Sequence, residues 1–337
     1  MTVLGHGYDD NVGAPAFRNM IINGGMNVAQ RNTSVSSNTT GGYLTADRWT
    51  GFISSLGTWT QSIENDAPTG SGHRKSLKML CTTANSSPSS GSYCQLSQAI
   101  EGQNLQHFAN GTSSAKTYTL SFWVKSNVTG TYIAELSASN GRAVSLSYTI
   151  SSSGVWEKKS LNFPADTIST IVNDNTVGIY LVLNLASGSS YTSGTLQTTW
   201  AATVNANRYV GQVNLASAIS NYWQITGVQL EAGPVATPFE FEPFETTLRK
   251  CQRYFYRHAP TGITYMSFAY AGAQQRLVLP LPCPMRATAN VSASGWAGGT
   301  TPTTSAINSM LSTINFYHAS GAYYIDTGTI IDVNAEL

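Results

Sequence analysis

The chain has 337 residues, of which 41% are hydrophobic and 10% aromatic, so it can bury more than one sizeable core. Charged residues make up only 10%, against about 25% in average soluble proteins, and the formal net charge is +1. These values argue against a disordered chain, and the lack of a basic patch argues against a nucleic-acid partner. Ser, Thr, Asn and Gly supply the polar surface instead, which suits close packing in an assembly or contact with sugars.

The beginning of the chain carries no targeting signal. Residues 1–10 lack both a basic start and an apolar core, and no stretch approaches the ~18 apolar residues of a membrane span. We therefore expect synthesis in the cytoplasm and no membrane insertion. Residues 1–17 show no hydrophobic periodicity and are predicted to form an N-terminal arm or linker.

Residues 18–233 are rich in short strand patterns. The segment 118–125 alternates, with Tyr118, Leu120, Phe122 and Val124 on one face. The segment 177–185 is nearly continuously apolar, as expected of a central strand, and 222–230 closes the unit. Many short strands, turns rich in Gly and Ser, and little helical periodicity predict an all-β fold, a jelly-roll β-sandwich.

Residues 186–216 form a long polar insertion whose main apolar anchor is Trp200. An unstructured loop of this length is uncommon unless it binds something. The insertion is therefore either a binding loop or structural decoration.

A linker and helix are predicted over residues 234–259. The phrase 227–241 begins as a strand, turns at Gly233-Pro234 and continues as an extended segment with aromatic residues. The helix is predicted over 245–257, because Leu248, Cys251, Tyr254 and Phe255 recur on one face. Residues 260–337 are predicted to form a smaller C-terminal β-sandwich domain.

The four cysteines, Cys81, Cys94, Cys251 and Cys283, show no CxxC spacing and are expected to be free buried thiols. No cofactor is expected, although a structural calcium held by Asp47, Glu64 or Glu231 fits a jelly roll. Nucleophile elbows, phosphate loops and zinc motifs are all missing from the sequence, so we predict that the protein is not an enzyme.

Aromatic side chains are the best candidates for glycan contacts, because sugar C–H faces stack on rings. The predicted glycan-binding residues are Trp59, Trp123, Trp200 and Trp223. Each of them also fits a core position. The triplet Asp47-Arg48-Trp49 is interpreted as a buried ion pair packed under the indole rather than as a sugar contact.

Several segments together resemble structural proteins of tailed bacteriophages, including tail fibres. They are the opening 19–26, the triplet 47–49, the close 229–233, the phrase 237–240, and the segments 251–255 and 279–287. The pattern of 118–125, followed by Trp156 and Phe163, is similar to jelly-roll carbohydrate-binding modules. The resemblance implies a virion protein that is made in the host cytoplasm and released by lysis.

The resemblance further implies a tail fibre or receptor-binding protein that contacts host surface polysaccharide. It also implies a homo-oligomer, a trimer, docked to other virion proteins. The predicted subunit interface consists of Phe239, Phe241, Phe244 and Tyr254. Two alternatives remain open: a capsid decoration or head-fibre protein that stabilises the shell, and a polysaccharide depolymerase.

Overall fold

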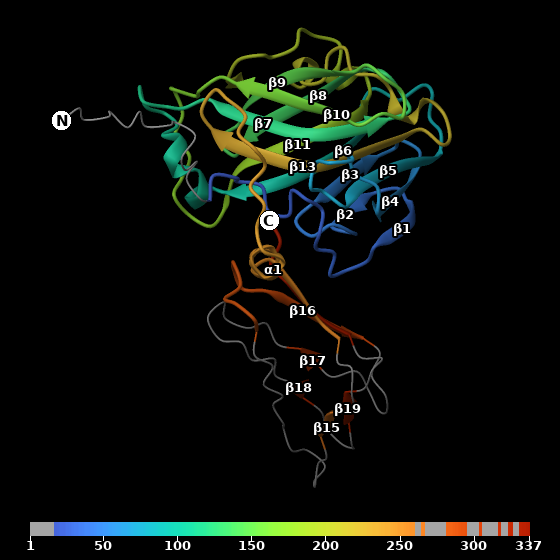
Figure 1. Cartoon of the computed structure of the whole chain (residues 1–337), viewed down its shortest axis with the longest axis vertical. Coiled ribbons are helices and arrows are strands. Elements are labelled where there is room, and N and C mark those ends of the chain that lie inside the picture. Colours follow the sequence, from blue (N-terminus) through green and yellow to red (C-terminus); the bar gives the residue numbers. More distant parts are fainter. Residues whose placement is uncertain are drawn as a thin grey trace, which may run out of the picture.

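The computed structural model of the chain describes residues 17–259, 281–294 and 330–337, and four further short strands within the C-terminal region. Two antiparallel sheets pack face to face in a β-sandwich, and a smaller β unit extends from one side of it (Figure 1). The predicted fold class, an all-β jelly-roll sandwich followed by a short helix and a smaller C-terminal β unit, is confirmed.

The first sheet of the sandwich, hereafter the six-stranded sheet, has the order β1-β4-β5-β13-β7-β10. Its strands are β1 (Ser34–Asn38), β4 (Thr58–Glu64), β5 (Ser76–Thr83), β13 (Tyr222–Ala232), β7 (Tyr118–Ser126) and β10 (Glu157–Phe163).

The second sheet, hereafter the seven-stranded sheet, has the order β12-β9-β8-β11-β6-β3-β2. Its strands are β12 (Ala201–Ala202), β9 (Arg142–Ile150), β8 (Gly130–Ala138), β11 (Val177–Ser187), β6 (Tyr93–Glu101), β3 (Thr50–Ser54) and β2 (Gly41–Gly42). Four short 3₁₀ helices connect the strands: η1 (Gly102–Phe108), η2 (Ser189–Tyr191), η3 (Asn205–Asn207) and η4 (Leu215–Ser217).

The core lies between the two sheets and follows the predicted alternation. In β7, Tyr118, Leu120, Phe122 and Val124 are fully buried, whereas Trp123 on the opposite face is half-buried. The apolar strand predicted over 177–185 is β11, in the middle of the seven-stranded sheet. Burying one large apolar side chain stabilises the fold by about 1.5–3 kcal/mol, so this continuous core dominates the stability of the sandwich.

The helix differs from its prediction. The helix α1 (Phe244–Gln252) ends before residue 257, because β14 (Phe255–His258) pairs as a strand with β20 (Ile330–Asn334). Tertiary pairing thus overrides the helical periodicity of these residues. The C-terminal sheet, β14-β20-β16 with β16 at Asn290–Ser294, therefore begins inside the segment predicted as linker and helix.

Two further strand pairs belong to the C-terminal unit. They are β15 (Thr264–Met266) with β19 (Tyr323–Ile325), and β17 (Thr303–Thr304) with β18 (Phe316–Tyr317). The predicted arm at 1–17 lies outside the described residues except for Phe17. None of the helices in the described part of the chain has the length and hydrophobicity needed to cross a membrane.

Candidate functional site

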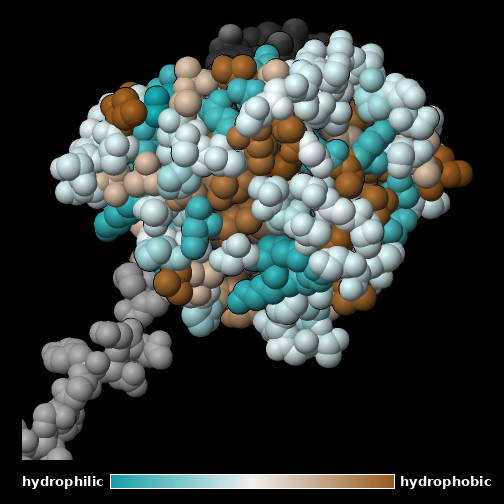
Figure 2. Space-filling model, turned by 90° about the horizontal axis from the view of Figure 1, so that it is seen from above, coloured by the Kyte–Doolittle hydropathy of each residue, from teal (hydrophilic) through white to brown (hydrophobic). Residues whose placement is uncertain are grey.

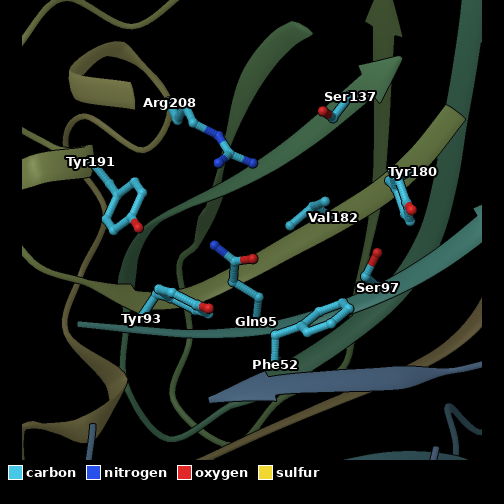
Figure 3. A pocket seen from close by; sticks show the side chains of 9 residues that line it. All are labelled: Phe52, Tyr93, Gln95, Ser97, Ser137, Tyr180, Val182, Tyr191 and Arg208. Carbon is cyan, nitrogen blue, oxygen red and sulfur yellow. The ribbon is translucent and has the colours of Figure 1, made fainter. Parts of the chain in front are cut away.

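A groove of about 360 Å³ crosses the outer face of the seven-stranded sheet (Figure 3). Strands β3, β6, β8 and β11 form its floor, and the insertion after β11 supplies one wall. The groove is lined by Phe52, Tyr93, Gln95, Ser97, Ser137, Tyr180, Val182, Tyr191 and Arg208.

The strand register explains why these side chains meet. Successive residues of a strand point to opposite faces, so every second residue of each strand faces outward. Phe52 lies opposite Gln95 on the neighbouring strand, and Tyr180 lies opposite Ser137. Each strand thus contributes one to three side chains to a continuous outer surface, while the alternate residues fill the core.

Aromatic rings border the groove. Phe52 is 41% exposed although it lies on a regular strand, and Tyr93, Tyr180 and Tyr191 are half-buried. The rings of Tyr93 and Tyr191 meet edge to face, with centroids 5.8 Å apart. Seen from above, the surface of the sandwich is largely polar, with hydrophobic side chains gathered near the middle of the view (Figure 2). Exposed rings beside polar groups suit a ligand with both apolar and hydroxylated surfaces.

The insertion predicted over 186–216 packs onto the sheet and builds the wall of the groove. Buried Tyr209 forms a small outer cluster with Ile133 and Val182, against which Tyr191 packs. Trp200 anchors the far part of the insertion, and its indole nitrogen donates a 2.7 Å hydrogen bond to the Pro164 carbonyl. Because these contacts hold the insertion in place, it presents Tyr191 and Arg208 to the groove.

A buried carboxylate lies beneath Arg208. Glu135 on β8 is fully buried and accepts hydrogen bonds from Arg208 Nε at 2.9 Å and Nη2 at 2.5 Å. The Tyr209 hydroxyl donates to the same carboxylate at 3.3 Å, and the Ser145 hydroxyl at 3.2 Å. We call Glu135, Arg208 and Tyr209 the groove trio.

Arg208 and Tyr209 hold fixed protonation states at neutral pH. Burial opposes the positive charge of Arg208, but the hydrogen bonds and charge of Glu135 outweigh burial and raise the pKa of the guanidinium. Burial, followed by the nearby Glu135 charge, raises the pKa of Tyr209 well above its usual value. The guanidinium therefore stays charged and the phenol stays neutral.

The groove offers binding groups rather than a pair of catalytic acids. Its lining provides rings, hydroxyls, the Gln95 amide and the Arg208 guanidinium, and it contains no Asp or Glu. Hydrolysis of a glycosidic bond by the usual route needs two carboxyl groups about 5–9.5 Å apart. The carboxylate nearest the lining, Glu135, is buried and occupied by hydrogen bonds.

Three of the four predicted glycan-binding tryptophans are in the core, which corrects that prediction. Trp59 and Trp223 are fully buried between the sheets, and Trp200 is 8% exposed. Each indole nitrogen has a partner inside the protein: the Leu56 carbonyl, the Tyr148 hydroxyl and the Pro164 carbonyl, respectively. These rings are unavailable to a ligand because they fill the interior.

Trp123 lies on the outer face of the six-stranded sheet, beside a second hollow. His73 lines this hollow, and its ring contacts those of Phe239 and Phe241 at centroid distances of 4.7 and 5.0 Å. Gly227 on β13 has a φ of 62°, and a Cβ there would stand 2.5 Å from the His73 ring. The linker residues Phe239 and Phe241 thus form one wall of this hollow, which has a volume of about 320 Å³.

The four predicted interface residues are in different environments. Phe241 and Phe244 are 58% and 53% exposed, and Phe239 is half-buried against His73. Tyr254, in contrast, is buried within the chain, and its hydroxyl donates a 2.5 Å hydrogen bond to Glu101. Its assignment to a subunit interface is wrong, because the ring is enclosed by the protein's own residues.

The triplet Asp47-Arg48-Trp49 is buried, but Asp47 and Arg48 do not pair with each other. Arg48 forms an ion pair with Glu336, and its guanidinium stacks 3.5 Å from the Tyr254 ring centroid. Asp47 accepts hydrogen bonds from both the backbone and the side chain of Gln30. The buried-ion-pair interpretation is right about burial and wrong about the partner.

These contacts belong to a junction between the sandwich and the C-terminal unit, which we call the joint. The chain end lies there, beside α1 (Figure 1). The joint consists of Arg31, Asp47, Arg48, Glu101, Arg253, Tyr254, Phe255, Arg286 and Glu336. Arg253 and Tyr254 bind buried Glu101 of β6 much as Arg208 and Tyr209 bind Glu135.

The residues considered for calcium do not come together. Glu231 accepts two hydrogen bonds from Thr237, at 2.9 and 2.6 Å, and so fastens the linker to β13. Among the described residues, no group of three or more His, Cys, Asp or Glu side chains is arranged to hold a metal ion. The four cysteines are free thiols, and all but Cys283 are buried.

The sequence alone does not single out the groove residues Phe52, Tyr93, Tyr180, Tyr191 and Arg208. One signal for the site is the length of the insertion 186–216, which predicts a binding loop and supplies Tyr191 and Arg208. The others lie on regular strands, where an outward aromatic residue has no local signature.

The sequence matches no protein-family model and no curated protein. Similar solved structures include the enzymatically active domain of tailspike protein 4 from bacteriophage CBA120, at 14% identity and a TM-score of 0.33. This match covers 64% of the present chain and only 21% of the tailspike chain.

Two other similar structures are carbohydrate-binding modules. One is TmCBM61 in complex with β-1,4-galactotriose, at 13% identity, with 64% of this chain and 99% of that chain covered and a TM-score of 0.30. The other is the family 11 module from Clostridium thermocellum with a mixed-linked tetrasaccharide, at 10% identity, 60% and 99% coverage and a TM-score of 0.29. These identities and TM-scores are too low to transfer the ligand or the role of those proteins to this chain, so both have to come from the geometry of its own groove.

Proposed function

We propose that the protein binds a carbohydrate chain in the groove of the seven-stranded sheet, without cleaving it. The observation that carries this proposal is the combination of exposed Phe52 and half-buried Tyr93, Tyr180 and Tyr191 with polar groups between them. A pyranose has an apolar C–H face and a rim of hydroxyls, so it needs both kinds of contact side by side.

The polar groups between the rings can bind sugar hydroxyls. The Gln95 side chain lies on the groove floor, opposite Phe52, and offers both an amide donor and a carbonyl acceptor (Figure 3). Ser97 is only 1% exposed at the bottom of the groove, and its hydroxyl donates to the Leu181 carbonyl at 2.9 Å, so it holds the floor in place. Arg208 Nη1 has no partner among the described residues and is a free donor at the wall.

Binding without hydrolysis is supported by the composition of the groove. Its lining has no carboxyl group, and the carboxylate beneath it is held by Arg208 and Tyr209. A glycosidase of the common type needs an acid and a base or nucleophile on either side of the scissile bond. We therefore favour an attachment protein over a depolymerase.

We further propose that the protein is a virion component, a tail fibre or receptor-binding protein that contacts host surface polysaccharide as a homotrimer. The sequence resemblance supports the virion assignment, and exposed Phe241 and Phe244 support a subunit interface along the linker. A single shallow groove binds weakly, but linked copies gain roughly 10²–10⁴ in avidity when all can engage.

Two experiments test these proposals. Titration of the protein against a polysaccharide panel should show saturable binding, and Phe52→Ala should weaken it. Immunogold electron microscopy of purified virions should place label on the tail. Label over the head would move the assignment to capsid decoration. No binding to any polysaccharide would reject the groove as a carbohydrate site.

A further inference from the structure

The charge of the groove is set by a residue that does not line it. Of the nine lining residues, Arg208 is the only one that carries a charge at neutral pH. Its side chain is 20% exposed, whereas that of Glu135 beneath it is fully buried. The guanidinium and the carboxylate are 2.5 Å apart at their closest atoms, which makes them one ion pair.

Only one edge of the Arg208 guanidinium is used by this ion pair. Glu135 binds Nε and Nη2, the side of the guanidinium that faces the sheet. The hydrogens of Arg208 Nη1 are therefore available to a ligand in the groove. Figure 3 shows the guanidinium reaching over the floor. A ligand in the groove therefore meets a hydrogen-bond donor whose charge is cancelled within one ion-pair distance.

We propose that Glu135 neutralises Arg208 and so makes the groove selective for uncharged sugars over sugars that carry carboxylate or sulfate groups. This inference rests on the proposed carbohydrate-binding function and names the class of ligand. Glu135 is a positioning and charge-setting residue, because it acts through Arg208 and does not touch the ligand.

The physical reason is a difference in desolvation. An anionic sugar loses hydration of its charge on entering the groove. Its attraction to a guanidinium that is already paired with Glu135 offsets little of this desolvation cost. The neighbouring rings oppose an anion as well, because the face of an aromatic ring carries partial negative charge. A neutral hydroxyl accepts from Nη1 without that cost.

The test compares matched ligands. Neutral glucans, galactans and mannans are each paired with the derivative whose C6 hydroxyl has been oxidised to a carboxylate, and both members are titrated against the full chain. The wild-type protein should bind a neutral member at least tenfold more tightly than its acidic partner. Its affinity for the neutral member should change little between low and high salt, since no net charge is recruited.

The variant Glu135→Gln keeps the shape and the acceptor oxygen but removes the neutralising charge. Arg208 is then a free cation in the groove. The ratio of acidic to neutral affinity should rise by about tenfold, which corresponds to one charge-assisted hydrogen bond. The gained affinity should fall as salt is raised, and a purely structural role of Glu135 would not produce that salt dependence.

The chain contains a matched control. Glu101→Gln makes the same change in an equally buried carboxylate that also binds an Arg-Tyr dipeptide, but at the joint. It should leave the acidic-to-neutral ratio unchanged. The double variant Glu135→Gln with Arg208→Gln should lose the acidic binding gained by Glu135→Gln alone.

The outcomes separate the two proposals. If no member of any pair binds, the carbohydrate-binding function fails and this inference fails with it. If neutral and acidic members bind the wild-type chain equally, or the acidic member binds better, the inference alone is overturned. It is also overturned if folded Glu135→Gln leaves the ratio unchanged. If Glu135→Gln does not fold, the wild-type ratio and its salt dependence decide.

Discussion

The groove and the joint lie on the same sheet and contain the same arrangement of side chains, which has a different role in each. In each, an Arg-Tyr dipeptide from outside the sheet binds a buried glutamate: Arg208 and Tyr209 on Glu135, Arg253 and Tyr254 on Glu101. At the joint, Arg48 stacks on Tyr254 and pairs with Glu336, so the arrangement links two parts of the chain. At the groove, it fixes a loop and leaves one guanidinium nitrogen for a ligand.

This difference shows that a buried ion pair is not by itself a sign of function. The surroundings decide what it does. Exposed Phe52 and half-buried Tyr180 border the groove trio, whereas the joint places Arg48 in a fully buried position. Substitutions at the joint and at the groove should therefore have effects that differ in kind.

The largest effect is expected from Arg48→Met at the joint. The substitution leaves the Glu336 carboxylate, whose side chain is 5% exposed, without its closest cationic partner. Breaking a buried pair in this way costs about 3–5 kcal/mol of unfolding free energy. Urea unfolding measures it. Exposed Arg74→Met is the control and should cost less than about 0.5 kcal/mol. A loss below 1 kcal/mol for Arg48→Met would show that the joint does not depend on this pair.

The second effect belongs to the groove. Phe52→Ala combined with Tyr180→Ala removes two ring contacts and should weaken polysaccharide binding by about 100-fold, or about 2.7 kcal/mol. The protein should stay folded, because Phe52 is 41% exposed and half-buried Tyr180 packs against the outer cluster rather than between the sheets. Calorimetric titration measures the affinity. Trp123→Ala, on the opposite sheet, is the matched control, and an equal loss there would place the ligand on the wrong face.

The third effect concerns assembly. Phe241→Ser with Phe244→Ser replaces two exposed rings, 58% and 53% accessible in the single chain, at the linker. If these rings bury between subunits, the pair of substitutions should cost about 1.5–3 kcal/mol per ring and dissociate the trimer. Light scattering after size exclusion gives the mass. Ile168→Ser, another exposed apolar residue, should leave the mass unchanged. A monomeric wild-type protein would contradict the interface.

The smallest effect is a pH dependence at the linker. Burial, and then the nearby Lys158 charge, lower the pKa of His73 from 6.5 to about 4. Between pH 6.5 and 4, His73 binds a proton in the unfolded chain but not in the folded chain. The free energy of unfolding therefore falls as the pH falls through this window. Because His73 is partly accessible to solvent, we expect a loss on the order of 1 kcal/mol.

Urea unfolding at pH 7 and pH 4.5 checks this effect. His73→Gln should remove that part of the pH dependence while keeping a polar side chain of similar size beside Phe239 and Phe241. An identical pH profile for the variant and the wild type would show that His73 does not titrate as inferred.

The sequence allowed the sandwich to be predicted because each strand carries its own period. In β7 the alternation of Tyr118, Leu120, Phe122 and Val124 assigns both the strand and its buried face. The end of the helix was not predictable from periodicity, since Phe255–His258 become a strand only by pairing with Ile330–Asn334. That partner lies far away in the chain.

The groove was less predictable than the joint for a related reason. Segments such as 47–49 and 251–255 attract attention because several of their residues act together at the joint. The groove takes isolated residues from separate strands, such as Phe52 and Tyr180, and they become neighbours only through the register of the sheet. Tryptophan does not indicate the ligand site in this chain, because the large side chains of Trp59 and Trp223 fill the core.

A crystal structure of the protein with the oligosaccharide that binds most tightly in the panel tests the carbohydrate groove most directly. We predict sugar density along the seven-stranded sheet, with one pyranose face against Phe52 or Tyr180 and a hydroxyl within hydrogen-bond distance of Arg208 Nη1. Density on the six-stranded sheet beside Trp123, with the groove empty, would show that the groove is not the carbohydrate-binding site.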